Sequence, residues 1–297
     1  LAPRPPRQPS LMTTINPFAD FLAAAIAQHP APICVGLDPV LDRLPASLTA
    51  DHPVPADALL IFSKGVIDAV AGIAPAVKFQ SACYERYGHA GVEALEASIS
   101  HARTRGLCII LDAKRGDIGV SSEHYAAAAA QAGAHAITVN GYLGPSGIAP
   151  FLTAGLGVFV LVRTSNPDSD TVQACRLADG RTVAELTADM VRELGERYLG
   201  AAGQSSVGAV VGATKAGEGG SLRLRMPQQT FLIPGYGAQG GTADDVRAML
   251  TKDRKGVLVT ASRSVIYPPT VEGQHWTDGV QAAAQTFAAE ISQVIKT

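Results

Sequence analysis

The sequence predicts one α/β domain folded as a (β/α)8 TIM barrel. Eight short segments rich in Val, Ile and Leu recur along the chain, each apolar almost throughout, as expected of parallel strands covered on both faces. Longer segments with helical spacing separate them, and this alternation favours a barrel over a doubly wound sheet. A length of 297 residues suits one barrel. We expect the barrel to span residues 15–297, with residues 1–14 a disordered tail or a remnant of cloning.

The elements follow in order from these patterns. Each predicted strand is a short apolar run, and each predicted helix is a longer, Ala-rich stretch with apolar residues at helical spacing. The sixth unit is the weakest, because residues 216–227 offer only a short, irregular helix. We expect strands at 33–38, 76–80, 107–112, 135–139, 157–163, 206–212, 230–235 and 256–262, and clear helices at 57–72, 89–105, 121–132, 181–200, 242–251 and 278–296.

Composition excludes several classes of function. Hydrophobic residues make up 47% and charged residues 17%, which provides a sizeable core. The net charge of −2 is scattered, so neither nucleic acid nor a membrane surface is an expected partner. No apolar stretch approaches the roughly 20 residues that cross a bilayer. Four widely spaced cysteines without a C-x-x-C pair favour a reducing compartment, and we expect a cytoplasmic protein.

Polar residues gather where the predicted strands end. The active sites of barrel enzymes lie on the rim formed by the carboxyl ends of the strands. Any single polar residue there could be a cap or a turn former, but agreement among several strands favours a functional site. The residues at or just beyond these ends are Asp38, Lys78, Asp112, Asn140, Ser165, Gln239 and Arg263.

The strongest local motif is D-A-K-R-G-D at residues 112–117. In an extended strand end, Asp112 and Lys114 point the same way, so a carboxylate and an ammonium can meet in one pocket. Gly116 permits a sharp turn, which sends the carboxylate of Asp117 elsewhere. Three charges directly after a buried strand favour chemistry over a solvated turn. A lysine held among carboxylates stays protonated, which suits a proton donor better than a Schiff-base nucleophile.

The second motif is the Gly-rich run P-G-Y-G-A-Q-G-G at 234–241. It matches G-x-G-x-x-G after a strand, but no acid follows about 20 residues later, as a dinucleotide fold requires. The run lies at the seventh strand, where barrels place phosphate sites. We therefore interpret Gly237 and Gly240 as part of a backbone nest for one phosphate, with Arg263 as its charged partner. A plain tight turn is the alternative.

These motifs resemble the orotidine 5′-monophosphate decarboxylase family, in its longer bacterial form. The run D-A-K-R-G-D-I-G at 112–119 looks like the signature of that family, and the likeness extends from Phe18 through the eighth strand. The other matching segments are F-Q-S-A-C-Y-E-R-Y-G (79–88), V-R-T-S-N-P (162–167), V-V-G-A-T (210–214), P-G-Y-G-A-Q-G-G (234–241) and A-S-R-S (261–264).

The resemblance implies decarboxylation of orotidine 5′-monophosphate (OMP) to uridine 5′-monophosphate (UMP) in pyrimidine biosynthesis, with neither a metal nor an organic cofactor. Lys114 would protonate C6 of the pyrimidine as carbon dioxide leaves, and Asp112 would lie beside the departing carboxylate. Lys78 would complete an alternating network of charges. Asp117 would reach the same pocket from the partner subunit, so the resemblance also implies a homodimer with shared active sites.

The remaining residues carried over by the resemblance would bind the nucleotide. Asp38 would hold the ribose, and Ser165 would contact the pyrimidine edge. Gln239 and Arg263 would lie on the phosphate side. Ile118, next to Asp117, would lie near the partner's site.

Three other functions stay open at this point. The nearest is a magnesium-dependent lyase or decarboxylase of keto-sugar phosphates, which has the same barrel and the same D-x-K-x-x-D run. Such an enzyme needs an acid at the end of the second strand, where this chain has Lys78. The seven histidines lack metal-site spacing. The other two are a Schiff-base aldolase using Lys78, Lys114 or Lys215, and a nucleotide-binding barrel without catalysis.

Overall fold

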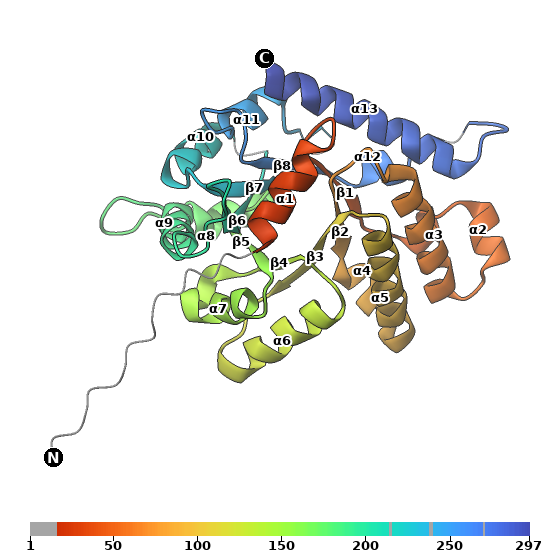
Figure 1. The fold of residues 1–297 in the computed structure, drawn as a ribbon, viewed down its shortest axis with the longest axis horizontal. Helices are drawn as coiled ribbons and strands as arrows, with labels where there is room; N and C mark the ends of the chain where they lie inside the picture. The colour runs from red at the N-terminus through yellow and green to blue at the C-terminus, as the bar shows by residue number, and fades with distance from the viewer. Residues whose placement is uncertain (1–16, 214–215, 238–239, 270) are drawn as a thin grey trace.

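Eight parallel strands pair in chain order and close into a barrel in the computed structural model, which describes residues 17–213, 216–237, 240–269 and 271–297. β1 pairs with β8 and so closes the sheet. Helices surround the barrel, so the predicted (β/α)8 fold is confirmed (Figure 1). The strands are β1 Ile33–Leu37, β2 Ala76–Gln80, β3 Cys108–Arg115, β4 Ala136–Val139, β5 Gly157–Arg163, β6 Ser205–Val211, β7 Gln229–Ile233 and β8 Val257–Ala261.

The observed strands differ from the predicted ones mainly at β3, which extends three residues beyond its predicted end at Asp112, to Arg115 of the charged motif. Opposite β4, β3 is irregular: Leu111 pairs with Ile137, but the next pair joins Arg115 to Val139. Three residues of β3 therefore lie opposite the single residue Thr138. A bulge of this kind re-aims side chains, and here it occurs at the carboxyl end of the strand.

Helices follow the strands, as predicted, but the helix predicted at 242–251 spans only Ala243–Ala248, and the helix at Pro145–Thr153 was not predicted. None of the described helices is long and apolar enough to cross a membrane. The longer helices are α1 Pro17–Ala27, α3 Pro55–Val70, α5 Gly88–Thr104, α6 Gly119–Gln131, α7 Pro145–Thr153, α9 Val183–Gly195, α10 Ala216–Arg225 and α13 Trp276–Lys296. The short ones are α2 Ala46–Asp51, α4 Ser81–Glu85, α8 Asp170–Gln173, α11 Ala243–Ala248 and α12 Arg263–Ile266, with 3-10 turns η1 Leu41–Arg43, η2 Gly141–Leu143 and η3 Pro167–Ser169.

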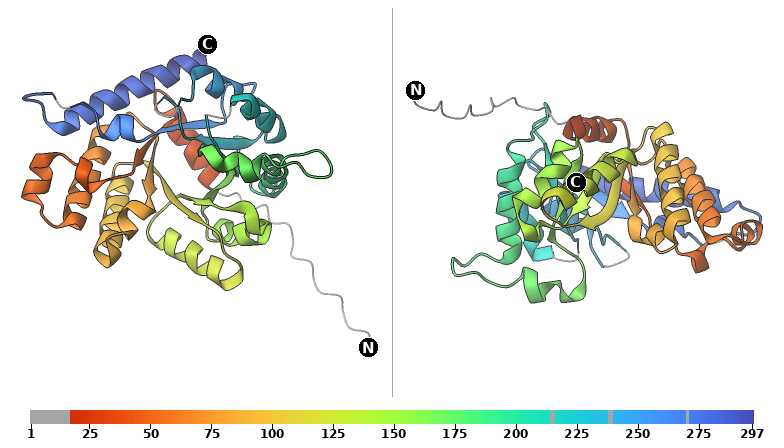
Figure 2. Two further views of the ribbon diagram at one scale, coloured as in Figure 1. Left: turned by 180° about the vertical axis from the view of Figure 1, so that it is seen from behind. Right: turned by 90° about the horizontal axis from the view of Figure 1, so that it is seen from below.

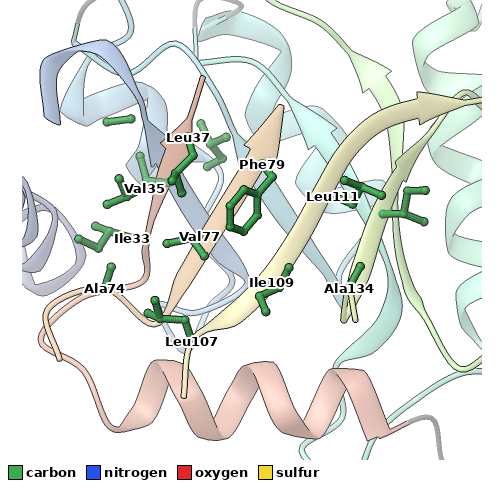
Figure 3. Packing of buried hydrophobic residues seen from close by; sticks show 14 of the residues in the cluster. Ile33, Val35, Leu37, Ala74, Val77, Phe79, Leu107, Ile109, Leu111 and Ala134 are labelled. Atoms are coloured by element: carbon green, nitrogen blue, oxygen red, sulfur yellow. The ribbon is translucent and has the colours of Figure 1, made fainter. Parts of the chain in front are cut away.

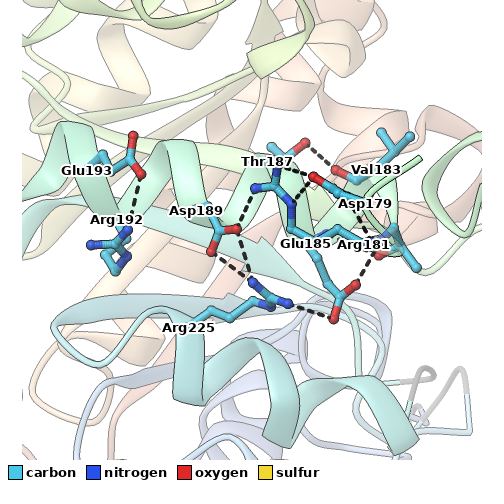
Figure 4. A network of polar contacts seen from close by, with 10 residues as sticks. Asp179, Arg181, Val183, Glu185, Thr187, Asp189, Arg192, Glu193 and Arg225 are labelled. Atoms are coloured by element: carbon cyan, nitrogen blue, oxygen red, sulfur yellow. Dashed lines mark hydrogen bonds and ion pairs between the residues drawn. The ribbon is translucent and has the colours of Figure 1, made fainter. Parts of the chain in front are cut away.

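The sixth unit contains a regular helix, α10, where the sequence predicted an irregular one. Ion pairs to the preceding helix α9 account for part of the difference (Figure 4). The guanidinium of Arg225 lies 3.2 Å from Glu185 and 3.0 Å from Asp189. Leu222 of α10 is buried in the core beneath. Packing and pairing with α9 thus compensate for the three glycines in α10.

The core forms two layers, because side chains alternate across each strand. The outer layer lies between the strands and the surrounding helices. Its strand residues include Ile33, Val35 and Leu37 of β1 and Val77 of β2 (Figure 3). The inner layer fills the barrel with side chains from the alternate strand positions, which are Cys34, Ala76, Cys108, Ile110, Ala136, Phe159, Val210, Leu232 and Leu258. Residues two positions further along β2, β3 and β4 therefore face the barrel axis near its carboxyl end.

Helix α1, which the sequence analysis did not predict, covers the other end of the barrel (Figure 2). Its Phe18 and Leu22 join the inner layer, and Phe18 packs edge-on against Phe159 with ring centroids 6.0 Å apart. Gly157 makes this possible, since a Cβ there would clash with the Phe18 ring. α1 seals the amino end of the barrel, which leaves the carboxyl end as the open one.

Candidate active site

A cavity of about 460 Å³ opens at the carboxyl end of the barrel, above the inner layer. This is the rim where the sequence placed the site. Its floor comes from β2, β3 and β4, and its walls come from the loops after β5, β7 and β8. The described lining residues are Asp38, Lys78, Gln80, Asp112, Lys114, Thr138, Leu161, Thr164, Ser165, Asn166, Gln173, Val210, Leu232, Pro234, Gly235, Tyr236, Thr260, Ala261, Ser262, Arg263 and Ser264.

The floor of the cavity carries an array of alternating charges. The carboxylate of Asp112 lies between two ammonium groups: Lys78 Nζ is 2.8 Å from Oδ2, and Lys114 Nζ is 2.6 Å from Oδ1. On its other side, Lys78 Nζ lies 3.5 Å from Asp38 Oδ1. Lys78 and Asp112 are buried, whereas the side chain of Lys114 is about half exposed toward the cavity.

Mutual attraction keeps this array charged. Burial by itself would raise the pKa of Asp112, but Lys78 and Lys114 outweigh burial and lower that pKa to about 2. Burial would likewise lower the pKa of Lys78, but Asp38 and Asp112 raise it above its ordinary value. At neutral pH the cavity therefore holds a carboxylate flanked by ammonium groups.

Lys114 has an unusual backbone conformation. Its φ is +45°, in the left-handed region that residues with a Cβ rarely occupy. It lies inside the β3 bulge, and Thr138 contacts it there: the Lys114 backbone N–H donates to Thr138 Oγ1 at 3.0 Å. Asp112 and Lys114 do meet in one pocket, as their spacing predicted, but through a bulge rather than a plain extended strand end. Strain at a site of this kind commonly accompanies function.

Sequence reasoning missed two residues of the floor, Gln80 and Thr138. The Thr138 hydroxyl donates to Asp112 Oδ1 at 2.9 Å, and Gln80 Nε2 donates to Oδ2 at 3.4 Å. A signal existed: Thr138 is the only hydroxyl residue in the predicted strand 135–139, and it lies two residues after the inward-facing Ala136. An inward polar residue at the upper end of a barrel strand is a candidate for the site.

Asp117 and Ile118 lie away from this cavity. The backbone N–H of Ile118 donates to the Asp117 carboxylate at 2.8 Å, at the exposed start of α6. The side chain of Ile118 is 60% exposed. Neither residue lines the cavity of its own chain. Within one chain, then, the structure separates Asp117 from Asp112 and Lys114.

The loop after β5, which includes Ser165, is held by a buried arginine. The guanidinium of Arg163 pairs with Asp170, and its Nε donates to Glu218 at 2.8 Å. The loop is also fastened from within, because Gln173 accepts from Thr164 N at 2.9 Å and donates to Thr164 Oγ1 at 2.7 Å. Ser165, next to these residues, lines the cavity. This network gives the loop one defined shape.

The Gly-rich segment after β7 forms a tight turn beside the cavity. Gly237 and Gly240 have positive φ values of 65° and 93°. Their backbone N–H groups bond within the turn, from Gly237 to the carbonyl of Gly241 and from Gly240 to the carbonyl of Gly237. Neither glycine lines the cavity, whereas Gly235 does. Their predicted phosphate contact therefore stays a prediction, and Gln239 and Lys215 lie outside the described residues.

Asp38 and Arg263 both line the cavity and follow the paired strands β1 and β8. Asp38 follows β1 directly, and Arg263 begins α12 after β8. Ser262 packs on Gly36, where a Cβ would clash with the Ser262 hydroxyl. Arg263 is exposed and lines the cavity wall. The cavity thus has a cationic wall at one side and the charged array on its floor.

Among the described residues, no group of three or more His, Cys, Asp or Glu side chains is arranged to hold a metal ion. The two carboxylates of the floor, Asp38 and Asp112, already pair with the Lys78 ammonium. The described floor thus offers two carboxylates and the ammonium groups of Lys78 and Lys114.

Comparisons with known proteins point in one direction. Residues 31–272 match the sequence model of the orotidine 5′-phosphate decarboxylase / HUMPS family. An orotidine 5′-phosphate decarboxylase from Rhodopirellula baltica is 40% identical over 90% of this chain and 96% of its own length. One from Clostridium perfringens is 39% identical over 89% of this chain and 94% of its own length. The solved structure of Leishmania donovani OMP decarboxylase matches with a TM-score of 0.78 and 30% identity, covering 94% of this chain and 99% of that one.

Proposed function

Since the chain belongs to the orotidine 5′-phosphate decarboxylase / HUMPS family, we propose that it is the carboxy-lyase that converts OMP to UMP and carbon dioxide in pyrimidine biosynthesis, using neither a metal nor an organic cofactor. The observation that carries the proposal is the charged array on the cavity floor, in which the Asp112 carboxylate lies within 2.8 Å of two ammonium groups.

Lys114 supplies the proton. When the bond between C6 and the carboxylate carbon breaks, neutral carbon dioxide leaves and the electron pair stays on C6. A fixed ammonium stabilises this developing charge without reorganising, which is usually the largest catalytic contribution of a site. The proton of Lys114 Nζ then forms the new C6–H bond, and the neutral amine regains a proton from water. The half-exposed side chain of Lys114 supports this role, because it reaches the cavity.

Asp112 acts on the departing group. Its low pKa keeps it ionised, so it repels a substrate carboxylate placed beside it. Two unit charges about 4 Å apart repel by about 4 kcal/mol at an effective dielectric constant of about 20. This repulsion vanishes as carbon dioxide forms. Lys78, bonded to Asp112 on the other side, keeps the carboxylate in place.

The nucleotide extends from this floor toward the wall. Asp38 binds the ribose, Ser165 binds the pyrimidine edge, and Gln239 and Arg263 take the phosphate side. The positions of Asp38, Ser165 and Arg263 around one cavity support this assignment. Binding energy from the remote phosphate can offset the repulsion at the reacting carboxylate, which explains the need for a grip so far from the bond that breaks.

A homodimer with shared active sites completes the proposal. Asp117 and Ile118 do not line the cavity of their own chain, and the exposed apolar side chains of Ile118, Val120, Tyr142 and Leu143 lie at the start of α6 and in η2. Tyr142 is 86% exposed. Large exposed apolar side chains that cluster mark contact surfaces. A second copy docked on these side chains brings Asp117 to the partner's cavity, with Ile118 beside it.

The same proposal includes a cytoplasmic location, which the four free cysteines support. The magnesium-dependent lyase is disfavoured by Lys78. Its ammonium lies 2.8 Å from Asp112, where it repels a divalent cation.

The direct test is to add OMP to the wild-type protein in excess chelator and to follow the ultraviolet absorbance. The protein is purified from a host that lacks its own OMP decarboxylase. We expect a rapid fall in absorbance, with UMP as the product by chromatography. Activity that vanishes in chelator and returns with magnesium contradicts the cofactor-free mechanism. No turnover under any condition rejects the proposed activity, and trapping by borohydride points instead to a Schiff base.

A further inference from the structure

The bulge in β3 leaves part of the backbone without a partner strand. Between the pairs Leu111–Ile137 and Arg115–Val139, β3 has three residues where β4 has only Thr138. A buried backbone N–H without a partner is costly, so each one in the bulge needs an acceptor. For Lys114 that acceptor is a side chain, because its N–H donates to Thr138 Oγ1 at 3.0 Å.

The Thr138 hydroxyl makes a second bond, and its direction is fixed. The backbone N–H of Lys114 can only donate, so the hydroxyl oxygen accepts there. The hydroxyl proton is then free to donate to Asp112 Oδ1, 2.9 Å away. Lys114 Nζ donates to the same oxygen at 2.6 Å. Thr138, Asp112 and Lys114 thus form a closed ring, in which one hydroxyl holds both the backbone of Lys114 and the anion that its ammonium contacts.

We propose that Thr138 is a positioning residue for the proton donor: its hydroxyl holds Lys114 in the left-handed conformation and fixes Asp112 Oδ1, so that the ammonium stays aimed into the cavity. The consequence for turnover rests on the proposed decarboxylase function. A left-handed residue with a Cβ persists only when its surroundings enforce it. Thr138 provides this enforcement, since it is only 1% exposed and stands on a barrel strand.

Gln80 does not provide the same control. Its Nε2 reaches the other oxygen of Asp112 at 3.4 Å, a longer contact, and Lys78 already bonds that oxygen at 2.8 Å. Among the described residues, the Lys114 backbone N–H bonds to Thr138, whereas Gln80 bonds to Asp112. The hydroxyl at position 138 is therefore the group that couples the carboxylate to the backbone of the proton donor.

The test compares Thr138→Val, which removes the hydroxyl at nearly constant volume, with Thr138→Ser, which retains it. Thr230→Val is the matched control, because Thr230 is a buried barrel threonine that does not line the cavity. A small misplacement of a reacting group can cost about 100-fold in rate. We expect Thr138→Val to lose about that factor in kcat with KM changed much less, Thr138→Ser to recover most of it, and Thr230→Val to keep wild-type kcat.

Crystal structures of the same variants decide the geometry independently of the activity. In Thr138→Val we expect Lys114 to leave the left-handed region and its Nζ to move away from Asp112 Oδ1, with both retained in Thr138→Ser. If Lys114 keeps its conformation and its contact in Thr138→Val, or if kcat is unchanged, Thr138 does not position the proton donor. A wild-type protein that does not decarboxylate OMP rejects the proposed function, while the structures still decide whether Thr138 holds Lys114.

Discussion

At the residue scale, Lys114 is held at both of its ends. Its backbone N–H is bonded to Thr138, and its ammonium is bonded to Asp112. The four methylene groups between them remain partly exposed. A side chain fixed in this way loses little further freedom when the substrate arrives, which is the condition for stabilising a transient charge without reorganisation.

The first prediction concerns this lysine. Lys114→Ala removes the proposed proton donor, so kcat should fall at least about 10³-fold, in the range expected for losing a general acid and a fixed charge. Binding of UMP, measured by calorimetry, should persist because the proposed phosphate contact of Arg263 is unchanged. Lys255→Ala, at an exposed lysine paired with Asp253, is the matched control and should behave as wild type. Near-normal turnover by Lys114→Ala would remove Lys114 from its assigned role.

The sequence predicted the meeting of Asp112 and Lys114, because side chains two residues apart in a strand share a face. It did not predict how they meet. A left-handed lysine has no sequence signal of its own, since it occurs in a bulge whose backbone bonds to Thr138, a neighbour on another strand. Asp117 shows the opposite case: its exclusion from the pocket followed from the turn that Gly116 was expected to permit.

At the element scale, the position of each strand end decides the chemistry of the cavity. Inward-facing residues of β2 and β3 are apolar at Ala76 and Ile110, and two residues later they are charged at Lys78 and Asp112. Along each of these two strands, the inward-facing side chains thus change from the apolar core to the charged cavity floor within two residues. The elements that the sequence did not predict, such as α1 and the regular α10, depend on contacts with distant residues such as Phe159 and Glu185.

A prediction for the loop after β8 concerns its arginine. Arg263 is exposed at the cavity wall. Arg263→Ala should lower kcat/KM for OMP, with a rise in the corresponding activation free energy of about 1.5–3 kcal/mol, the value of a hydrogen bond to a charged group. With orotidine, which lacks the phosphate, the loss should be much smaller. Steady-state kinetics on both substrates measure the difference. Equal losses would mean that Arg263 acts on folding or on the pyrimidine instead.

At the scale of the whole molecule, one end of the barrel is closed and the other is open. α1 packs Phe18 and Leu22 into the amino end, and the cavity occupies the carboxyl end. The alternation of strands and helices was sufficient to predict the closed barrel. It could not predict the shape of the cavity, because this depends on loops such as 164–173 that are fixed by long-range pairs, including Arg163 with Glu218.

The proposed sharing of active sites between subunits gives a prediction for the assembled protein. Lys114→Ala and Asp117→Ala homodimers should each be nearly inactive. After subunit exchange, each mixed dimer has one pocket with both lesions and one with an intact Lys114 and Asp117. Random exchange makes half of the dimers mixed, so activity should recover to about a quarter of wild type for independent, equally stable sites. Mass spectrometry confirms the exchange. An inactive mixture with exchange confirmed would place both residues in one subunit's site.

The pairing of β1 with β8 also has a consequence for how the chain folds. These strands come from opposite parts of the sequence, so their pairing closes a very long loop and costs more entropy than pairing neighbours. Asp38 and Arg263 stand on the two sides of this seam. If Asp38 binds the ribose and Arg263 the phosphate, as proposed, an unclosed chain has neither a complete ribose site nor a complete phosphate site. A nucleotide that contacts both residues binds only the closed barrel. By mass action, its binding therefore shifts the folding equilibrium toward the state in which β1 and β8 are paired.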